Sequence, residues 1–116
     1  MTYTAIAAML ATLKIPTAYY QFPQGTAQKT PFICFFYEGS EDFYADNKNY
    51  KKIRTLQIEL YTDEKDFTLE AQVENLLDTY GLTYTVTESY IDSERMHETV
   101  YTTEINIEEE TTNADG

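Results

Sequence analysis

The chain has 116 residues, and its 20 acidic and eight basic residues give a formal net charge of -12 and an isoelectric point near 4.2. Such a surplus of carboxylates argues against a protein that binds nucleic acid by neutralising phosphates or docks on an anionic membrane. The length suits one domain, which we expect to span residues 1–109 before a disordered acidic tail at 110–116.

The cysteine content indicates a reducing compartment. Cys34 is the one cysteine and lies in an apolar run, so no intrachain disulfide can form and we expect a buried structural thiol. No stretch of the sequence reaches the roughly 20 apolar residues of a membrane helix, and the first residues lack the pattern of a signal peptide. We therefore expect a soluble intracellular protein without a membrane partner.

The first predicted elements are a helix and two short extended segments. Thr2 or Thr4 supplies an N-cap, apolar residues then recur at steps of three and four, and Pro16 is predicted to end the helix. An aromatic stretch at 18–22 and an apolar strand at 32–37 follow, separated by residues typical of turns. This order predicts a hairpin or an early strand pair.

The clearest strand covers residues 54–61. Apolar and polar residues alternate along it, as a half-buried strand requires, and the apolar set is Leu56, Ile58 and Leu60. The preceding segment, 43–53, is predicted to be a polar loop that carries aromatic side chains. Four of the eight basic residues lie in this loop and at the start of the strand: Lys48, Lys51, Lys52 and Arg54.

A second helix and a hairpin complete the predicted elements. Asp63 or Asp66 supplies the N-cap of the helix, and Gly81 occupies its C-cap position. Two runs rich in β-branched and aromatic residues, 83–90 and 96–107, predict a C-terminal hairpin. The apolar stripe of the helix consists of Leu69, Val73, Leu76, Leu77 and Tyr80.

The order of helix, strands, helix and strands favours an α+β fold over a doubly wound parallel sheet. We expect an antiparallel sheet of about four to five strands with two helices packed on one face. The last strand is predicted to carry apolar side chains on both faces, with Tyr101 and Ile105 on one and Val100 on the other. Such a strand is either an irregular edge or half of a contact with another chain.

The sequence offers little material for catalysis, so we expect no enzyme, no catalytic residues, no metal and no cofactor. The single histidine, His97, is predicted to be a surface residue because no second histidine accompanies it. Four acidic residues are predicted to form a solvated loop, since their spacing lacks the ligand alternation and glycine of a calcium loop. They are Glu38, Glu41, Asp42 and Asp46.

Aromatic residues are the other unusual component. The chain has eleven tyrosines and six phenylalanines but no tryptophan, and tyrosine serves both in cores and in protein interfaces. Phe43, Tyr44 and Tyr50 flank the predicted polar loop, where burial in the domain's own core is least expected. Both a core role and a partner contact stay open for these three residues.

Five segments form a pattern of order and spacing along the chain. They are YYQFPQG at 19–25, PFICFFY at 31–37, FYADNKNYKK at 43–52, IELYTDEKD at 58–66 and ESYIDSERMHET at 88–99. In these segments the chain resembles the small tail-completion proteins, also called head-to-tail joining or neck proteins, of long-tailed phages and prophages of Gram-positive bacteria. The resemblance extends over nearly the whole chain and includes no catalytic motif.

The resemblance implies a virion structural protein that completes the tail and joins it to the head. It implies a ring, commonly of six subunits, at the head-tail interface, assembled in the host bacterial cytoplasm. The implied partners are further copies of the chain, the head connector or adaptor, and the major tail tube protein. DNA would pass through without specific binding, since dense carboxylates make a repulsive lumen. A monomer is plausible before assembly.

Within such a ring, the basic cluster is expected to contact an acidic patch on the next subunit. The acidic patch is either the Glu41/Asp42 segment or the turn at Asp92 and Glu94, and lysines that only balance local acids are the simpler alternative. The candidate interface residues are Phe43, Tyr44, Tyr50, Lys51, Lys52, Arg54, Asp92 and Glu94.

Other functions stay open. A tail terminator that caps the tail tube also uses a hexameric ring of α+β domains, so sequence does not separate it from a joining protein. An unrelated acidic module that binds proteins by mimicking DNA would need its carboxylates on one continuous face, whereas here they are spread over the chain. A small hydrolase is the least supported class, because the histidine, cysteine and glycine motifs are missing.

Overall fold

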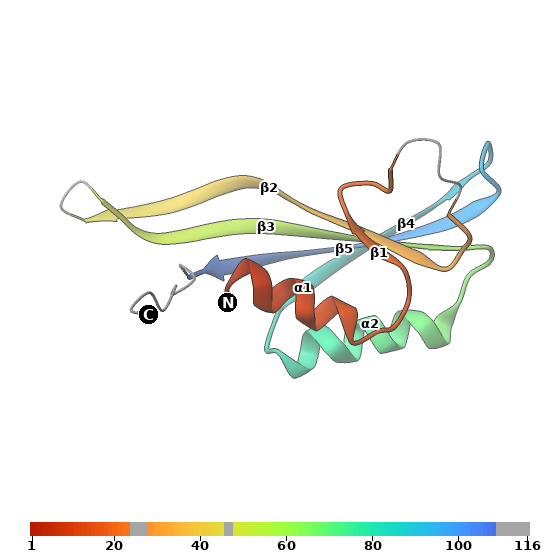
Figure 1. Ribbon diagram of the computed structural model, residues 1–116, viewed down its shortest axis with the longest axis horizontal. Coiled ribbons are helices and arrows are strands. Elements are labelled where there is room, and N and C mark those ends of the chain that lie inside the picture. Colours follow the sequence, from red (N-terminus) through yellow and green to blue (C-terminus); the bar gives the residue numbers. More distant parts are fainter. Residues whose placement is uncertain (24–27, 46–47, 109–116) are drawn as a thin grey trace.

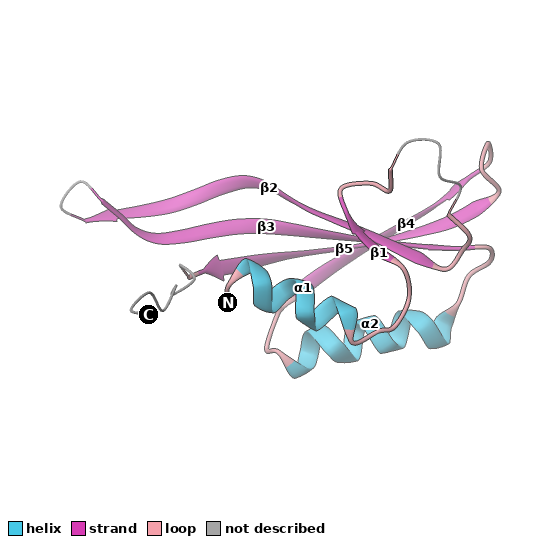
Figure 2. Cartoon of the chain, in the orientation of Figure 1, coloured by secondary structure: helices cyan, strands magenta, loops and turns pink. Residues whose placement is uncertain are grey.

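The computed structural model describes residues 1–23, 28–45 and 48–108, and side chains outside 40–51. In this part of the chain, two helices lie on one face of a five-stranded sheet (Figures 1 and 2). The α+β prediction is therefore confirmed. The elements are α1 (Tyr3–Ala11), β1 (Thr17–Tyr19), β2 (Phe32–Ala45), β3 (Lys48–Thr62), α2 (Phe67–Thr79), β4 (Tyr84–Ile91) and β5 (Met96–Ile107).

The sheet has the strand order β1-β2-β3-β5-β4. All neighbours are antiparallel except β1 and β2, which pair in parallel from Thr17 opposite Ile33 to Tyr19 opposite Phe35. The predicted early strand pair thus exists, but it is not a hairpin and the sheet is mixed. Twelve residues separate the end of β1 at Tyr19 from the start of β2 at Phe32, which is about the length that a connection between parallel strands requires.

β2 and β3 form a hairpin that projects beyond the rest of the sheet (Figure 1). β5 accompanies β3 only as far as Lys52, which lies opposite Ile107, so within the described residues the start of β3 pairs with β2 alone. The prediction of a polar loop at 43–53 is therefore wrong over most of that range, which belongs to β2 and β3. Sequence reasoning missed the strands because a projecting two-stranded ribbon needs no buried face and so no apolar alternation.

The predicted acidic loop is wrong for the same reason. Glu38, Glu41 and Asp42 all belong to β2, and Asp42 lies opposite Lys52 in the hairpin register. Asp46 lies outside the described residues, as does the predicted acidic tail at 110–116.

The two helices begin where the sequence predicts. The side chain of Thr2 accepts a hydrogen bond from the backbone N–H of Ala5, and Asp66 caps α2 through the N–H of Leu69 at 2.9 Å. α1 ends at Ala11, well before Pro16, and Lys14 then turns the chain with φ +59°. Neither helix has the length and apolar character of a membrane-crossing segment.

The core lies between the sheet and the helices. The alternation predicted for 54–61 is confirmed, because its apolar members are fully buried beneath both helices. β5 is an interior strand of the sheet and buries every second residue, so the predicted irregular edge is wrong. The central core residues are Ile6, Leu10, Leu56, Ile58, Leu60, Val73, Leu77 and Tyr101. Cys34 is a buried free thiol, as predicted.

Candidate protein interface

Large apolar side chains that stay exposed gather near the two edges of the sheet. Among the described residues, those near the edge formed by β1 are Tyr3, Tyr19 and Tyr20, here named the β1-edge patch. At the opposite edge of the sheet, Phe67, Val86 and Tyr90 form the β4-edge patch. Tyr80 is exposed at the end of α2. These side chains are between 40% and 75% exposed. Exposed apolar groups at sheet edges indicate surfaces for contact with other proteins.

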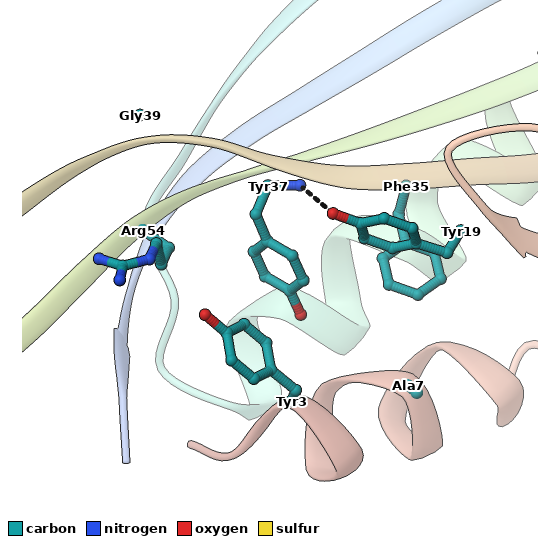
Figure 3. A pocket seen from close by; sticks show the side chains of 7 residues that line it. All are labelled: Tyr3, Ala7, Tyr19, Phe35, Tyr37, Gly39 and Arg54. Carbon is teal, nitrogen blue, oxygen red and sulfur yellow. Dashed lines mark hydrogen bonds between the residues drawn. The ribbon is translucent and has the colours of Figure 1, made fainter. Parts of the chain in front are cut away.

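The β1-edge patch borders a hollow between β2 and α1, which we name the aromatic groove. Its volume is about 450 Å³. The ring of Tyr37 lies 4.9 Å from that of Tyr3 and 5.9 Å from that of Tyr19, and Arg54 lies at one end of the hollow (Figure 3). The lining residues are Tyr3, Ala7, Tyr19, Phe35, Tyr37, Gly39 and Arg54.

The hydroxyl of Tyr37 is buried and has no hydrogen-bond partner among the described residues. Burial raises the pKa of Tyr37 to about 12, and the neighbouring Tyr3 and Tyr19 add to this. The hydroxyl therefore keeps its proton at neutral pH and is a donor without an acceptor. A buried donor in this state costs the folded chain free energy.

The outer edge of β2 is open beside the groove. β1 pairs only with residues 33–35, and the backbone N–H of Tyr37 donates to the hydroxyl of Tyr19 at 3.4 Å instead of to a strand. Gly39 follows with φ +64°, within a register shift between Glu38 and Glu41. Beyond Tyr37, β2 has no strand partner on this side in the described chain, so it presents an unpaired edge.

An ionic cluster fixes the residues beside the β4-edge patch. The Nζ of Lys65 lies 2.6 Å from Oε2 of Glu88 on β4 and 2.8 Å from Oε1 of Glu70 on α2. The same ammonium lies 5.0 Å from the centre of the Phe67 ring. Because one lysine contacts both elements, the exposed ring of Phe67 is held close to β4.

His97 is largely buried next to this cluster, so its prediction as a surface histidine is wrong. Its side chain is 12% exposed, and its Nε2 lies 3.6 Å from Oε1 of Glu88. The reason is topological: His97 lies on β5, an interior strand, and faces the helices with the buried residues of that strand. Among the described residues, no group of three or more His, Cys, Asp or Glu side chains could hold a metal ion.

The predicted interface residues lie in two separate places. Lys52 and Arg54 lie at the base of the hairpin, and Arg54 lines the aromatic groove. Asp92 and Glu94 are exposed in the turn between β4 and β5, at the opposite end of the molecule (Figure 1). The structure therefore does not bring the two charged sets together within one chain. The hairpin also includes Phe43, Tyr44, Tyr50 and Lys51, whose side chains lie outside the described part.

Sequence reasoning missed the groove residues Tyr3, Tyr19 and Tyr37. The signal was the excess of tyrosine, which indicates interface surface without locating it. The groove arises only because α1, β1 and β2 meet at one edge of the sheet.

The fold recurs in other solved structures. No protein-family model matches the chain, and no curated protein matches it. Seven chains of solved structures match it, including a chain of the virion of a native gene transfer agent particle. That chain has a TM-score of 0.61 and 17% sequence identity, over 88% of this chain and 86% of its own length. At this identity, the likeness concerns the fold.

Proposed function

We propose that this chain is a structural virion protein that completes a tail and joins it to the head connector, as a ring around the path of the DNA. The fold shared with a chain of a gene transfer agent virion supports a structural role in such a particle. Six subunits per ring and partners in the connector and tail tube are parts of this proposal that rest on the sequence resemblance. A single domain spanning 1–109 is also part of it and rests on the length of the chain.

The observation that carries the proposal is the difference between the two edge patches. The β1-edge patch borders an aromatic groove, whereas the β4-edge patch is a strip of protruding side chains beside an ionic cluster. Two unlike surfaces on one molecule favour heterologous contacts between copies, and such contacts close into a ring when the rotation between copies allows it. A symmetric dimer would use a single self-complementary patch instead.

Charge complementarity supports the same contact. Arg54 and Lys52 lie at the hairpin base, near the groove, while Asp92 and Glu94 follow directly after β4. Since Lys52 lies beside the end of β5 and the turn with Asp92 and Glu94 precedes its start, the two sets meet only between copies. Asp42 is the register partner of Lys52 within the hairpin, which leaves the turn at Asp92 and Glu94 as the intermolecular partner that we propose.

The experiment is a deletion of the gene in its phage or prophage, with lysates compared by negative-stain electron microscopy with a complemented control. Separate filled heads and tails of normal length are the expected result. Abnormally long tails would assign the terminator function instead. Intact infectious particles would reject both ring functions and leave the acidic protein-binding module as the function to pursue.

A further inference from the structure

The start of β3 has a free backbone edge. β2 pairs with β3 as far as Lys48, whereas β5 ends at Ile107, opposite Lys52, and the hairpin continues beyond it (Figure 1). In the described chain, residues 48–51 therefore have no strand partner on the side of β5. A two-stranded ribbon by itself is marginally stable in water, and a third strand on its free edge would add main-chain hydrogen bonds.

The chain that follows β5 begins beside this edge. The backbone N–H of Glu108 donates to the carbonyl oxygen of Met1 at 2.9 Å, which fixes the main chain just beyond the last residue of β5. Continued by one residue, the register of β3 with β5 places Glu108 opposite Lys51. Continued further, it places residues 109–111 opposite residues 48–50. Residues 108–111 are here named the exit segment.

A register shift within the hairpin changes this placement little. The shift lies between the pairs that Phe43 and Tyr44 form with β3. A β-bulge adds one residue to one strand, so a residue of the exit segment moves by one position at most. Glu109 and Glu110 then still lie opposite residues 48–50.

The two segments carry opposite charges. Three consecutive glutamates begin the exit segment, and Lys48 and Lys51 lie at the start of β3. The register partners of these lysines in β2 are Ala45 and Phe43, so neither lysine lies directly opposite an acid of β2. Because opposite charges on neighbouring strands stabilise their pairing, the exit segment suits this edge.

The exit segment also has an advantage over a segment of another copy. It follows β5 directly, so its effective concentration at the free edge is roughly millimolar, as for a short tether. A second copy at micromolar concentration competes poorly with it. β3 begins at Lys48, so the pairing ends at Thr111, and disorder stays a prediction for the residues that follow.

We infer that residues 108–111 add to the free edge of β3 as a short antiparallel strand in the free chain, with their glutamates beside Lys48 and Lys51. Lys51 also belongs to the contact proposed with Asp92 and Glu94 of another copy. The added strand therefore competes with that contact and keeps free chains from associating before assembly. The competition rests on the proposed function, whereas the strand does not.

Hydrogen exchange of three purified proteins tests the strand: the full chain, a chain that ends at Thr111 and a chain that ends at Glu108. Those amides of residues 48–51 that point away from β2 are expected to exchange about tenfold or more slowly in the first two proteins. The chain that ends at Thr111 is the matched control, because it lacks only the last five residues. Circular dichroism checks folding. Equal exchange in all three proteins would overturn the inference.

Carbodiimide crosslinking separates pairing within one chain from pairing between copies. Unlabelled and isotope-labelled full chains are mixed, crosslinked, digested and analysed by mass spectrometry. The expected product joins a lysine of 48–51 to Glu109 or Glu110, with both peptides from chains of the same label. Lys65 lies 2.6 Å from Glu88 and gives the positive control in the same sample. Hairpin products of mixed label would show that a second copy occupies the edge, and their absence beside the control product would exclude any occupant; both results overturn the inference.

Sedimentation at increasing protein concentration tests the competition. The chain that ends at Glu108 should associate at about tenfold lower concentration than the chain that ends at Thr111, because Lys51 is uncovered. Glu64→Gln/Asp78→Asn in the longer of these chains removes two exposed charges elsewhere and should not promote association. Equal association of the two truncated chains would overturn the competition. That result would leave the proposed function untouched, since the gene deletion tests it separately.

Discussion

The hydroxyl of Tyr61 lies between two carboxylates, 2.8 Å from Oε2 of Glu98 and 3.2 Å from Oε1 of Glu59. Tyr61 and Glu98 are register partners on β3 and β5, and the alternation of β5 puts them on the face opposite the buried core. One hydroxyl proton can serve only one of the two carboxylates at a time. Burial, and then the charge of Glu98, raise the pKa of Glu59.

Glu59→Gln is therefore expected to stabilise the protein at neutral pH. Because the pKa of Glu59 is raised in the folded state, its charged form opposes folding above that pKa. The protein regains this stability as the pH falls through the raised pKa towards 4.5, the ordinary pKa of a glutamate. The gain at pH 7 should be up to about 1 kcal/mol, the range for partly solvated charges. Urea unfolding from pH 7 to pH 4.5 measures it, with Glu104→Gln as the control. A gain that does not shrink with acidification would contradict this account.

Lys65→Met is expected to destabilise the fold by about 1–3 kcal/mol. The substitution keeps the length of the side chain but removes the ammonium that neutralises Glu70, whose carboxylate is buried and otherwise accepts a hydrogen bond from Thr99. Denaturant unfolding at pH 7 measures the change. Lys29→Met removes an exposed charge of the same kind and should change the free energy of unfolding by less than about 0.5 kcal/mol. Similar losses in both variants would refute the stabilising role of the cluster.

Elements whose pattern is local could be predicted from the sequence. The alternation around Ile58 fixes the buried face of β3, Asp66 and Gly81 mark the ends of α2, and the two runs around residues 92–95 form the predicted hairpin. Each of these signals depends on residues close together in the chain. The apolar side chains of these elements also account for much of the core.

Features that depend on distant pairing could not be predicted. The parallel pairing of β1 with β2 requires a return connection that no periodicity in the sequence reveals. The strand at Lys52 was predicted as a loop because its residues are mostly polar and show no alternation with apolar residues. His97 is buried only because β5 lies inside the sheet. The groove is the same kind of feature, since Tyr3 and Tyr37 meet through the packing of α1 on β2.

The double variant Lys51→Glu/Lys52→Glu is expected to block tail joining without unfolding the domain, because it reverses the charge at the hairpin that is proposed to meet Asp92 and Glu94 of another copy. Complementation of the deletion measures joining, and circular dichroism checks folding. Lys14→Glu/Lys29→Glu imposes the same change in net charge at exposed positions away from the hairpin and should still complement. Normal joining by the hairpin variant would reject the electrostatic contact.

Tyr37→Phe tests whether the buried Tyr37 hydroxyl lacks a hydrogen-bond acceptor. In the free chain, the Tyr37 hydroxyl has no partner among the described residues, so its removal should leave the free energy of unfolding unchanged or raise it by up to about 1 kcal/mol. Tyr101→Phe is the matched control: its hydroxyl lies 3.2 Å from Oε2 of Glu74, and its removal should cost about 0.5–1.5 kcal/mol.

Urea unfolding of the two variants at pH 7 measures both changes, and circular dichroism checks that each variant is folded. The difference between the variants is the test, because both substitutions remove one buried hydroxyl and keep the ring. A Tyr37→Phe protein destabilised as much as Tyr101→Phe would mean that the Tyr37 hydroxyl already has a hydrogen-bond acceptor in the folded chain.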